Sequence, residues 1–94
     1  MLPEKVNICG IPHKVVLCSD AFDSDEIHYG QIDYMRALIT INEDASEELQ
    51  MQTLFHEVIH GMLVMIGRSE ESRNEEFVQA LANALYQTFR LKEQ

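Results

Sequence analysis

An apolar stretch from Leu54 to Ile66 contains one charged residue, Glu57, and two histidines, His56 and His60. Residues four apart lie on the same face of an α-helix, so the two imidazoles can bind one metal ion. Glu57, about 100° further round the helix, can reach a water bound to that metal and act as a general base. The spacing His56-Glu57-x-x-His60 therefore predicts a buried helix that carries a metal site, with Glu57 as its catalytic residue.

The alternative is a core helix with two hydrogen-bonded imidazoles and no metal. It leaves Glu57 buried without a partner, which is costly for a carboxylate. A metal-bound water supplies that partner, so the metal site is the preferred interpretation.

Length and charge narrow the classes of protein that fit. The 94 residues predict a single domain, 1–94, of a size that often needs a metal or another crosslink for stability. The net charge of −9 and the absence of a basic stripe argue against nucleic acid and against an anionic membrane surface as partners. The N-terminal residues lack an apolar signal core and no run reaches transmembrane length, so we expect a cytoplasmic location.

The two cysteines, Cys9 and Cys18, are too few for a secreted disulfide framework. Both fall in stretches that resemble strands, and free cysteines are usually buried, so we expect buried thiols. A disulfide between them, or a Cys9 thiolate that caps the metal in a latent form, are the alternatives.

Two strand pairs are expected before the motif helix. Residues 6–9 and 14–18 predict a hairpin that turns at Gly10, and residues 29–34 and 37–41 predict a second pair. Between them, residues 19–26 form an acidic stretch without a calcium-binding pattern, which indicates a solvated loop.

Two helices are expected after the strands. Asp44-Ala45-Ser46-Glu47 has the spacing of a capping box and predicts the start of the motif helix, which should end near Ile66 with Gly67 as its stop. A final helix is predicted from around Ser69–Ser72 to Leu91, with an inward stripe formed by Val78, Leu81, Ala82, Leu85 and Phe89. The predicted fold class is α+β: a small antiparallel sheet of 3–4 strands packed on the motif helix and on an antiparallel C-terminal helix.

A third metal ligand is needed, because two histidines alone hold zinc weakly. In an antiparallel helix hairpin that turns near Gly67, Glu75 lies level with His60 and at the edge of the inward stripe. Its neighbour Glu76 points outward and is the less favoured choice. Ser72-Arg73-Asn74-Glu75 is also a capping box, so capping is the competing role for Glu75. The other two histidines, His13 and His28, lack helical spacing to the motif but folding could bring them near.

These residues resemble the gluzincin clan of zinc metallopeptidases, in which a second helix carries a glutamate ligand. Asn74-Glu75, followed six positions on by Leu81, is similar to that glutamate helix. The size, the hairpin-rich start and the final helix look most like compact phage- and mobile-element-encoded members, the ImmA/IrrE-like proteins and the minigluzincins. The resemblance is specific over residues 54–86. It implies a sheet edge that binds extended peptide above the zinc, for which residues 37–42 are the candidate.

The expected function is that of a zinc-dependent endopeptidase that hydrolyses an intracellular protein through a zinc-bound water. Zn²⁺ on His56, His60 and Glu75 would polarise the scissile carbonyl, and Glu57 would move the proton from the water to the leaving amine. The resemblance suggests a repressor encoded by the same element as one candidate substrate. For the group that stabilises the oxyanion, His28, Tyr29 and Tyr34 are candidates.

The alternative function is a catalytically weak or inactive metallopeptidase-like module that binds a protein partner. The spacing of fifteen positions from His60 to Glu75 is short for the clan, which leaves little room for subsites. Structural zinc sites, however, are usually closed by four protein ligands, and three good ligands leave an open position. The peptidase is therefore the preferred interpretation.

Overall fold

The computed structural model describes residues 2–19 and 29–90, which form one four-stranded sheet and three helices. The strands are β1 (Lys5–Ile8), β2 (Ile11–Cys18), β3 (Gly30–Asp33) and β4 (Leu38–Asn42). The helices are α1 (Glu47–Met65), α2 (Ser69–Ser72) and α3 (Glu75–Arg90). The predicted α+β class is confirmed. The acidic stretch 20–26 lies outside the described residues.

The strand order is β1-β2-β4-β3, and the sheet is mixed rather than wholly antiparallel as predicted. Both predicted hairpins are present as antiparallel pairs, β1 with β2 and β3 with β4. The second hairpin docks through β4, which pairs with β2 in parallel. Residues 37–42 are therefore not an edge, and that prediction is wrong: β4 is a central strand, and β3 is the edge strand of this hairpin.

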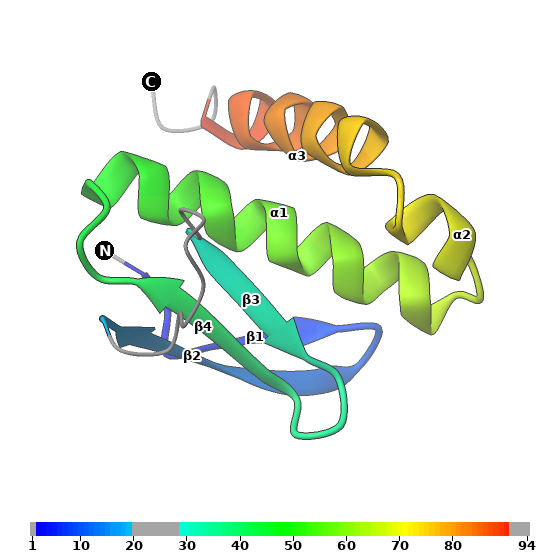
Figure 1. Ribbon diagram of the computed structural model, residues 1–94, viewed down its shortest axis with the longest axis horizontal. Helices are drawn as coiled ribbons and strands as arrows, with labels where there is room; N and C mark the ends of the chain where they lie inside the picture. The colour runs from blue at the N-terminus through cyan, green and yellow to red at the C-terminus, as the bar shows by residue number, and fades with distance from the viewer. Residues whose placement is uncertain (1, 20–28, 91–94) are drawn as a thin grey trace.

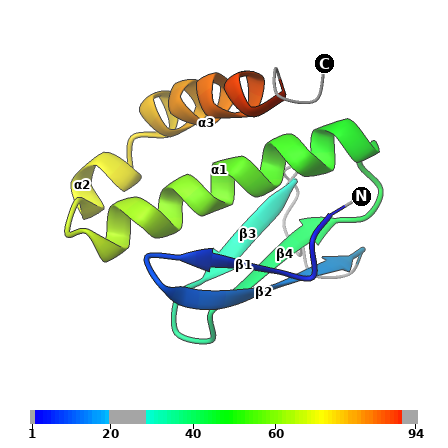
Figure 2. The same ribbon diagram turned by 180° about the vertical axis from the view of Figure 1, so that it is seen from behind.

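The molecule has three layers, seen in Figures 1 and 2 as the sheet, then α1, then α2 and α3. Helix α1 packs on the sheet, while α3 contacts α1 and α2 and, within the described residues, none of the strands. A first apolar cluster joins α1 to the sheet through Ile8, Val15, Ile39, Ile41 and Leu54. A second joins α1 to α3 through Ile59, Leu63, Val78 and Ala82. Helix α1 is thus the central element, as its apolar sequence predicted.

Helix α1 begins and ends with recognisable caps. Ser46 is the N-cap, and its hydroxyl accepts from the backbone N–H of Leu49 at 3.2 Å. The predicted capping box is off by two residues, since Asp44 lies in the preceding turn, where its N–H bonds the Asn42 side chain. At the other end Gly67 has a φ of 82°, which a glycine adopts without strain, and stops the helix as predicted.

The final helical segment is broken in two. The chain leaves α2 at Arg73, and Asn74 then caps α3 by accepting from the N–H of Phe77 at 3.1 Å. The capping box predicted from Ser72 does not form, and a single helix from Ser69–Ser72 onward is wrong. Glu75 becomes the first residue of α3, which leaves its side chain available for another role.

Gly61, directly after His60, lies where α1 approaches the sheet most tightly. A Cβ added there would lie 3.0 Å from Cδ1 of Ile8 and 3.1 Å from Cδ1 of Ile32. Close packing against two sheet side chains explains this interior glycine.

Candidate metal centre

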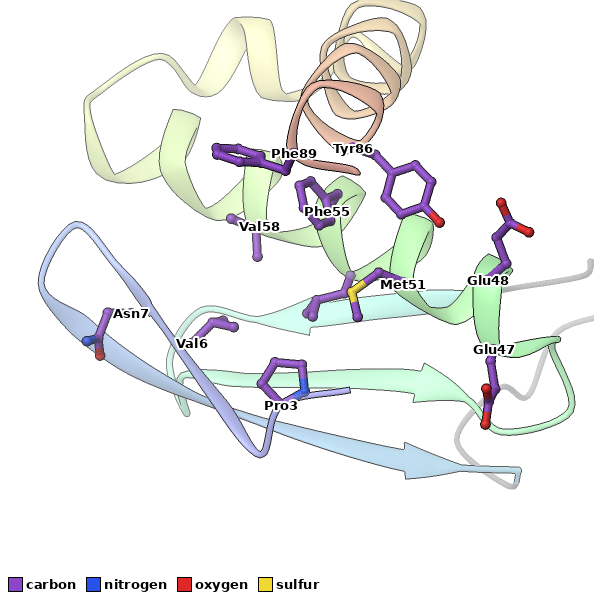
Figure 3. Close-up of a pocket in the computed structure, with 11 residues that line it drawn as sticks. Pro3, Val6, Asn7, Glu47, Glu48, Met51, Phe55, Val58, Tyr86 and Phe89 are labelled. Carbon is purple, nitrogen blue, oxygen red and sulfur yellow. The ribbon is translucent and has the colours of Figure 1, made fainter. Parts of the chain in front are cut away.

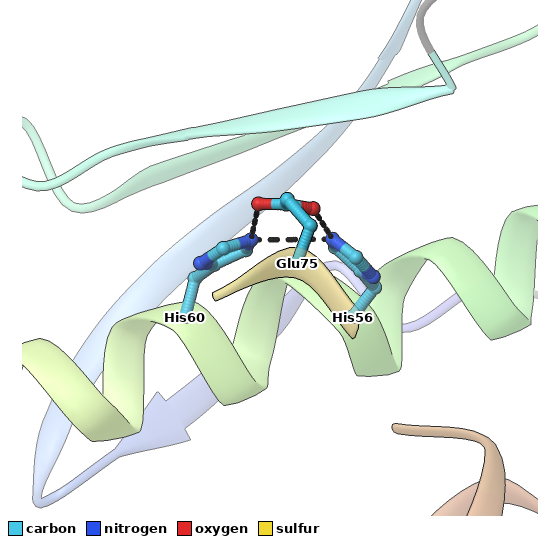
Figure 4. Close-up of side chains that lie close together, drawn as sticks. All are labelled: His56, His60 and Glu75. Atoms are coloured by element: carbon cyan, nitrogen blue, oxygen red, sulfur yellow. Dashed lines mark hydrogen bonds and ion pairs between the residues drawn. The ribbon is translucent and has the colours of Figure 1, made fainter. Parts of the chain in front are cut away.

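His56 and His60 face the same side of α1, one turn apart (Figure 4). Their ring centroids are 4.8 Å apart, and their Nε2 atoms approach to 3.2 Å. Two ring nitrogens at this separation repel each other unless a proton or a cation lies between them. The geometry predicted from the motif spacing is present.

Glu75 comes from the start of α3 and closes the triangle. One carboxylate oxygen lies 3.1 Å from His56 Nε2, and the other lies 3.0 Å from His60 Nε2. Within the described ranges, these three residues are the group whose ligand atoms all lie within 4.8 Å of one another. Two ligands of a tetrahedral zinc lie about 3.3 Å apart for metal–ligand distances near 2.0–2.1 Å, within a few tenths of an ångström of these separations. The donor set therefore fits a divalent transition metal.

The outward-facing nitrogens of both rings have acceptors that fix their tautomers. His56 Nδ1 donates to Gln79 Oε1 at 2.7 Å, because the Gln79 amide nitrogen is occupied in donating to Asn83. His60 Nδ1 donates to Ser72 Oγ at 3.0 Å, and that hydroxyl faces the His60 carbonyl at 3.4 Å. Because both Nδ1 atoms carry protons, both Nε2 lone pairs point at Glu75. Metal-bound histidines are commonly oriented in the same way, by a partner of the other ring nitrogen.

The charge states suit a metal as well. Burial lowers the pKa of His60 below its ordinary value, although the charge of Glu75 acts in the opposite direction. A neutral imidazole is the form that binds a metal. Three acceptor atoms therefore converge on one point.

Glu57 lies next to this point and is buried, with 7% of its surface exposed. Burial, and then the charge of Glu75, raises the pKa of Glu57 from 4.5 to about 7. Among the described residues, none donates a hydrogen bond to its carboxyl group. A buried carboxyl group without a donor and with a pKa near neutrality is typical of a general base or acid.

Two hollows flank the three ligands, one on each side. The first, of about 380 Å³, holds Glu57 and is bordered by Tyr29 and Gly30 at the start of β3. The second, of about 610 Å³, is bordered by Tyr34, Val64, Ser69, Ser72 and Arg73, together with His60 and Glu75. Glu75 borders both hollows, so an extended ligand that fills them would pass directly over the ligand atoms.

Tyr34 follows the edge strand β3 and reaches the second hollow. Burial raises the pKa of its phenol, the charges of Glu57 and Glu75 add to this, and the Ser72 hydroxyl lowers it. The phenol therefore keeps its proton and can act as a hydrogen-bond donor beside the ligands. Of the three candidates for an oxyanion-stabilising group, Tyr29 borders the first hollow and His28 lies outside the described residues.

Several other candidates are not brought to the site. His13 is buried in β2, where its Nδ1 bonds the Ile11 carbonyl at 2.8 Å and its Nε2 has no partner. Glu76 borders a shallow depression beside Glu75 but is not one of the three ligands. Cys9 and Cys18 are free, and Cys9 is exposed in the β1–β2 turn rather than buried as predicted. Neither the disulfide nor the Cys9 metal cap is present.

Ser72 and Gln79, which hydrogen-bond the two histidines, were not identified from the sequence. Gln79 lies four residues after Glu75, so on α3 the two share a face that meets His56. The spacing of Glu75 and Gln79 could therefore have identified Gln79 from the sequence. No pattern in the sequence identified Ser72, because its position depends on the break between α2 and α3.

A larger hollow than these two lies elsewhere among the described residues. It measures about 790 Å³ and is lined by apolar side chains of the β1 region, α1 and α3, with Glu47 and Glu48 at one end (Figure 3). None of the three ligands lines it, so its size does not mark the site of chemistry.

No helix among the described residues is long and apolar enough to cross a membrane. Comparison of the chain with protein-family models, with curated proteins and with solved structures finds no match.

Proposed function

We propose that this protein is a zinc-dependent peptidase. The observation that supports this is the convergence of His56 Nε2, His60 Nε2 and the Glu75 carboxylate, with the buried Glu57 carboxyl group beside them. Three protein ligands leave an open coordination position, which is the arrangement of catalytic rather than structural zinc. Zinc in this position supplies Lewis-acid polarisation of a carbonyl and activation of water.

The protein side chains divide the remaining work. Glu57 accepts the proton of the attacking water and returns it to the leaving amine, which its pKa of about 7 suits at neutral pH. Tyr34 donates a hydrogen bond to the oxyanion, since its phenol stays protonated and borders the hollow that contains His60. Ser72 and Gln79 hold the imidazoles in the metal-binding tautomer.

The substrate in this proposal is an extended segment of a protein. Among the described strands, β3 pairs only with β4, and Gly30 at its start borders the hollow that contains Glu57. A peptide that adds to the open side of β3 would hydrogen-bond through its backbone and lie across the ligands. From the motif resemblance we further propose that the protein is phage-encoded and cleaves a repressor in the host cytoplasm.

The test is turnover of unfolded protein. Zinc-loaded protein should cleave fluorescently labelled casein, lose this activity to 1,10-phenanthroline and regain it when zinc is added back. Glu57→Gln should keep about one zinc per chain and lose cleavage. Cleavage by the Glu57→Gln variant would contradict the mechanism.

The same assay distinguishes the peptidase from the alternative function, a binding module without activity. A wild-type protein that holds zinc but cleaves no unfolded substrate would be a binding module. A folded protein that takes up no zinc would make His56 and His60 core residues.

A further inference from the structure

The hollow beside His60 contains an arginine with no partner assigned to it. Arg73, between α2 and α3, borders this hollow together with Tyr34, Val64 and Ser69. Its backbone position is fixed, because its N–H bonds the carbonyls of Ser69 and Glu70 at 3.2 Å. Arg73 thus lies at the border of the hollow, two residues from Glu75.

The other arginines whose side chains the structure describes are engaged locally. Arg36 pairs with Asp33 at 3.1 Å, and Arg68 pairs with Glu71 at 2.7 Å. Among the described residues, no carboxylate lies within 4 Å of the Arg73 guanidinium. Arg73 is therefore an exposed cation, on an acidic chain, that is available to an external anion.

We propose that this hollow is a specificity subsite that binds a carboxylate of the substrate through Arg73. The proposal rests on the proposed peptidase function, because it concerns the peptide that lies over the same ligands. A guanidinium donates two parallel hydrogen bonds to a carboxylate, and the hydroxyl of Ser69 on the same hollow can add a third. Val64 offers an apolar surface for the methylene groups that precede an acidic group.

The net charge of the molecule bears on this preference for a carboxylate. Its acidic charge disfavours acidic peptides in general, so a preference for a carboxylate at one position must come from a local cation. Two sources of that carboxylate share the chemistry: an acidic side chain near the scissile bond, or the C-terminal carboxylate of a short peptide. The experiment below distinguishes them.

The probes are quenched fluorescent heptapeptide mixtures that differ only in Glu or Gln at one fixed position, each made with a free or an amidated C-terminus. We expect a kcat/KM for the carboxylate form at least about tenfold above that of its amide, the effect of one good charge-assisted pair. Arg73→Gln should abolish the difference while keeping one zinc per chain, and Arg73→Glu should favour Lys at that position. The control is Arg68→Gln, which removes another exposed arginine, from the turn between α1 and α2 and outside the lining of this hollow, and should leave the preference unchanged.

Binding keeps the subsite testable without turnover. Fluorescence anisotropy with zinc-loaded Glu57→Gln protein should show the same Glu-over-Gln or acid-over-amide difference, which Arg73→Gln should remove. Selective binding without wild-type cleavage would support the subsite and contradict the peptidase. Equal binding of carboxylate and amide peptides, or a preference that survives Arg73→Gln, would overturn the subsite.

Discussion

Glu57 is a carboxylic acid enclosed between α1, the start of β3 and a second carboxylate. Burial first, and the charge of Glu75 second, raise its pKa from 4.5 to about 7. Between these pH values the folded chain holds a proton that the unfolded chain has released. The contribution of Glu57 to the free energy of unfolding of the metal-free protein therefore falls as the pH rises from about 4.5 to 7.

Glu57→Gln should remove this penalty. In metal-free protein we expect the variant to be more stable than the wild type at pH 8, by on the order of 3 kcal/mol, and much closer to it at pH 4.5. His60, whose pKa burial lowers, contributes stability that is lost as the pH falls, but it is present in both proteins and cancels in the difference. Urea unfolding at the two pH values in the presence of a chelator measures the difference. A gap that does not change with pH would contradict the assignment.

The hydrogen bonds from His60 to Ser72 and from His56 to Gln79 are also features at the scale of single residues. Ser72→Ala or Gln79→Ala should weaken zinc binding about ten- to a hundredfold, because each removes the acceptor that fixes one imidazole. Competition with a chromogenic chelator measures the affinity. Glu76→Gln is the control and should bind zinc like the wild type, whereas loss of zinc in this variant, with zinc retained in Glu75→Gln, would show that the wrong glutamate was assigned.

At the level of elements, the start of α3 decides whether the third ligand reaches the histidines. Asn74 caps α3 through the N–H of Phe77, and Glu75 follows directly. Asn74→Ala should cost about 1 kcal/mol of stability, typical of a lost N-cap, and should also weaken zinc binding.

Asn74→Asp is the matched variant, since Asp caps a helix as well as Asn does. We expect it to keep both stability and zinc affinity, as measured by urea unfolding and chelator competition. An Asn74→Ala variant that loses stability but binds zinc normally would show that the cap does not position Glu75.

The elements also show how far the sequence could predict the structure. Residues 56, 57 and 60 defined most of the site because helical spacing is a local rule, and the phase of Glu75 on the next helix chose it over Glu76. The parallel pairing of β2 with β4 was missed although the composition favoured β4 as the central strand, since it has Leu38, Ile39 and Ile41 whereas β3 has Ile32 alone. The break at Arg73 and Asn74 was missed because two overlapping caps, Ser72 and Asn74, compete in that stretch, and tertiary packing decides between them.

At the scale of the whole molecule, the proposed metal site would connect two layers that otherwise meet through a small apolar cluster. Zinc on His56, His60 and Glu75 would link α1 to α3, and any ligand that binds only the folded chain stabilises it. Zinc at a hundred times its dissociation constant should add about 2.7 kcal/mol, and for a domain of this size raise Tm by roughly 10–20 °C. Calorimetry with and without chelator measures the shift. His56→Ala should show no shift, and a wild-type Tm unaffected by zinc would contradict a site that joins the layers.

The distribution of the ligands over two helices also sets the order in which a metal can arrive and leave. The two imidazoles are half-buried on one rigid helix and are oriented by Gln79 and Ser72, whereas 67% of the Glu75 side chain is exposed. We expect an incoming ion to bind the two imidazoles first and the carboxylate last. The carboxylate should then also be the first ligand to dissociate, so the lifetime of the bound metal, as distinct from its affinity, should depend on one exposed side chain at the first residue of α3.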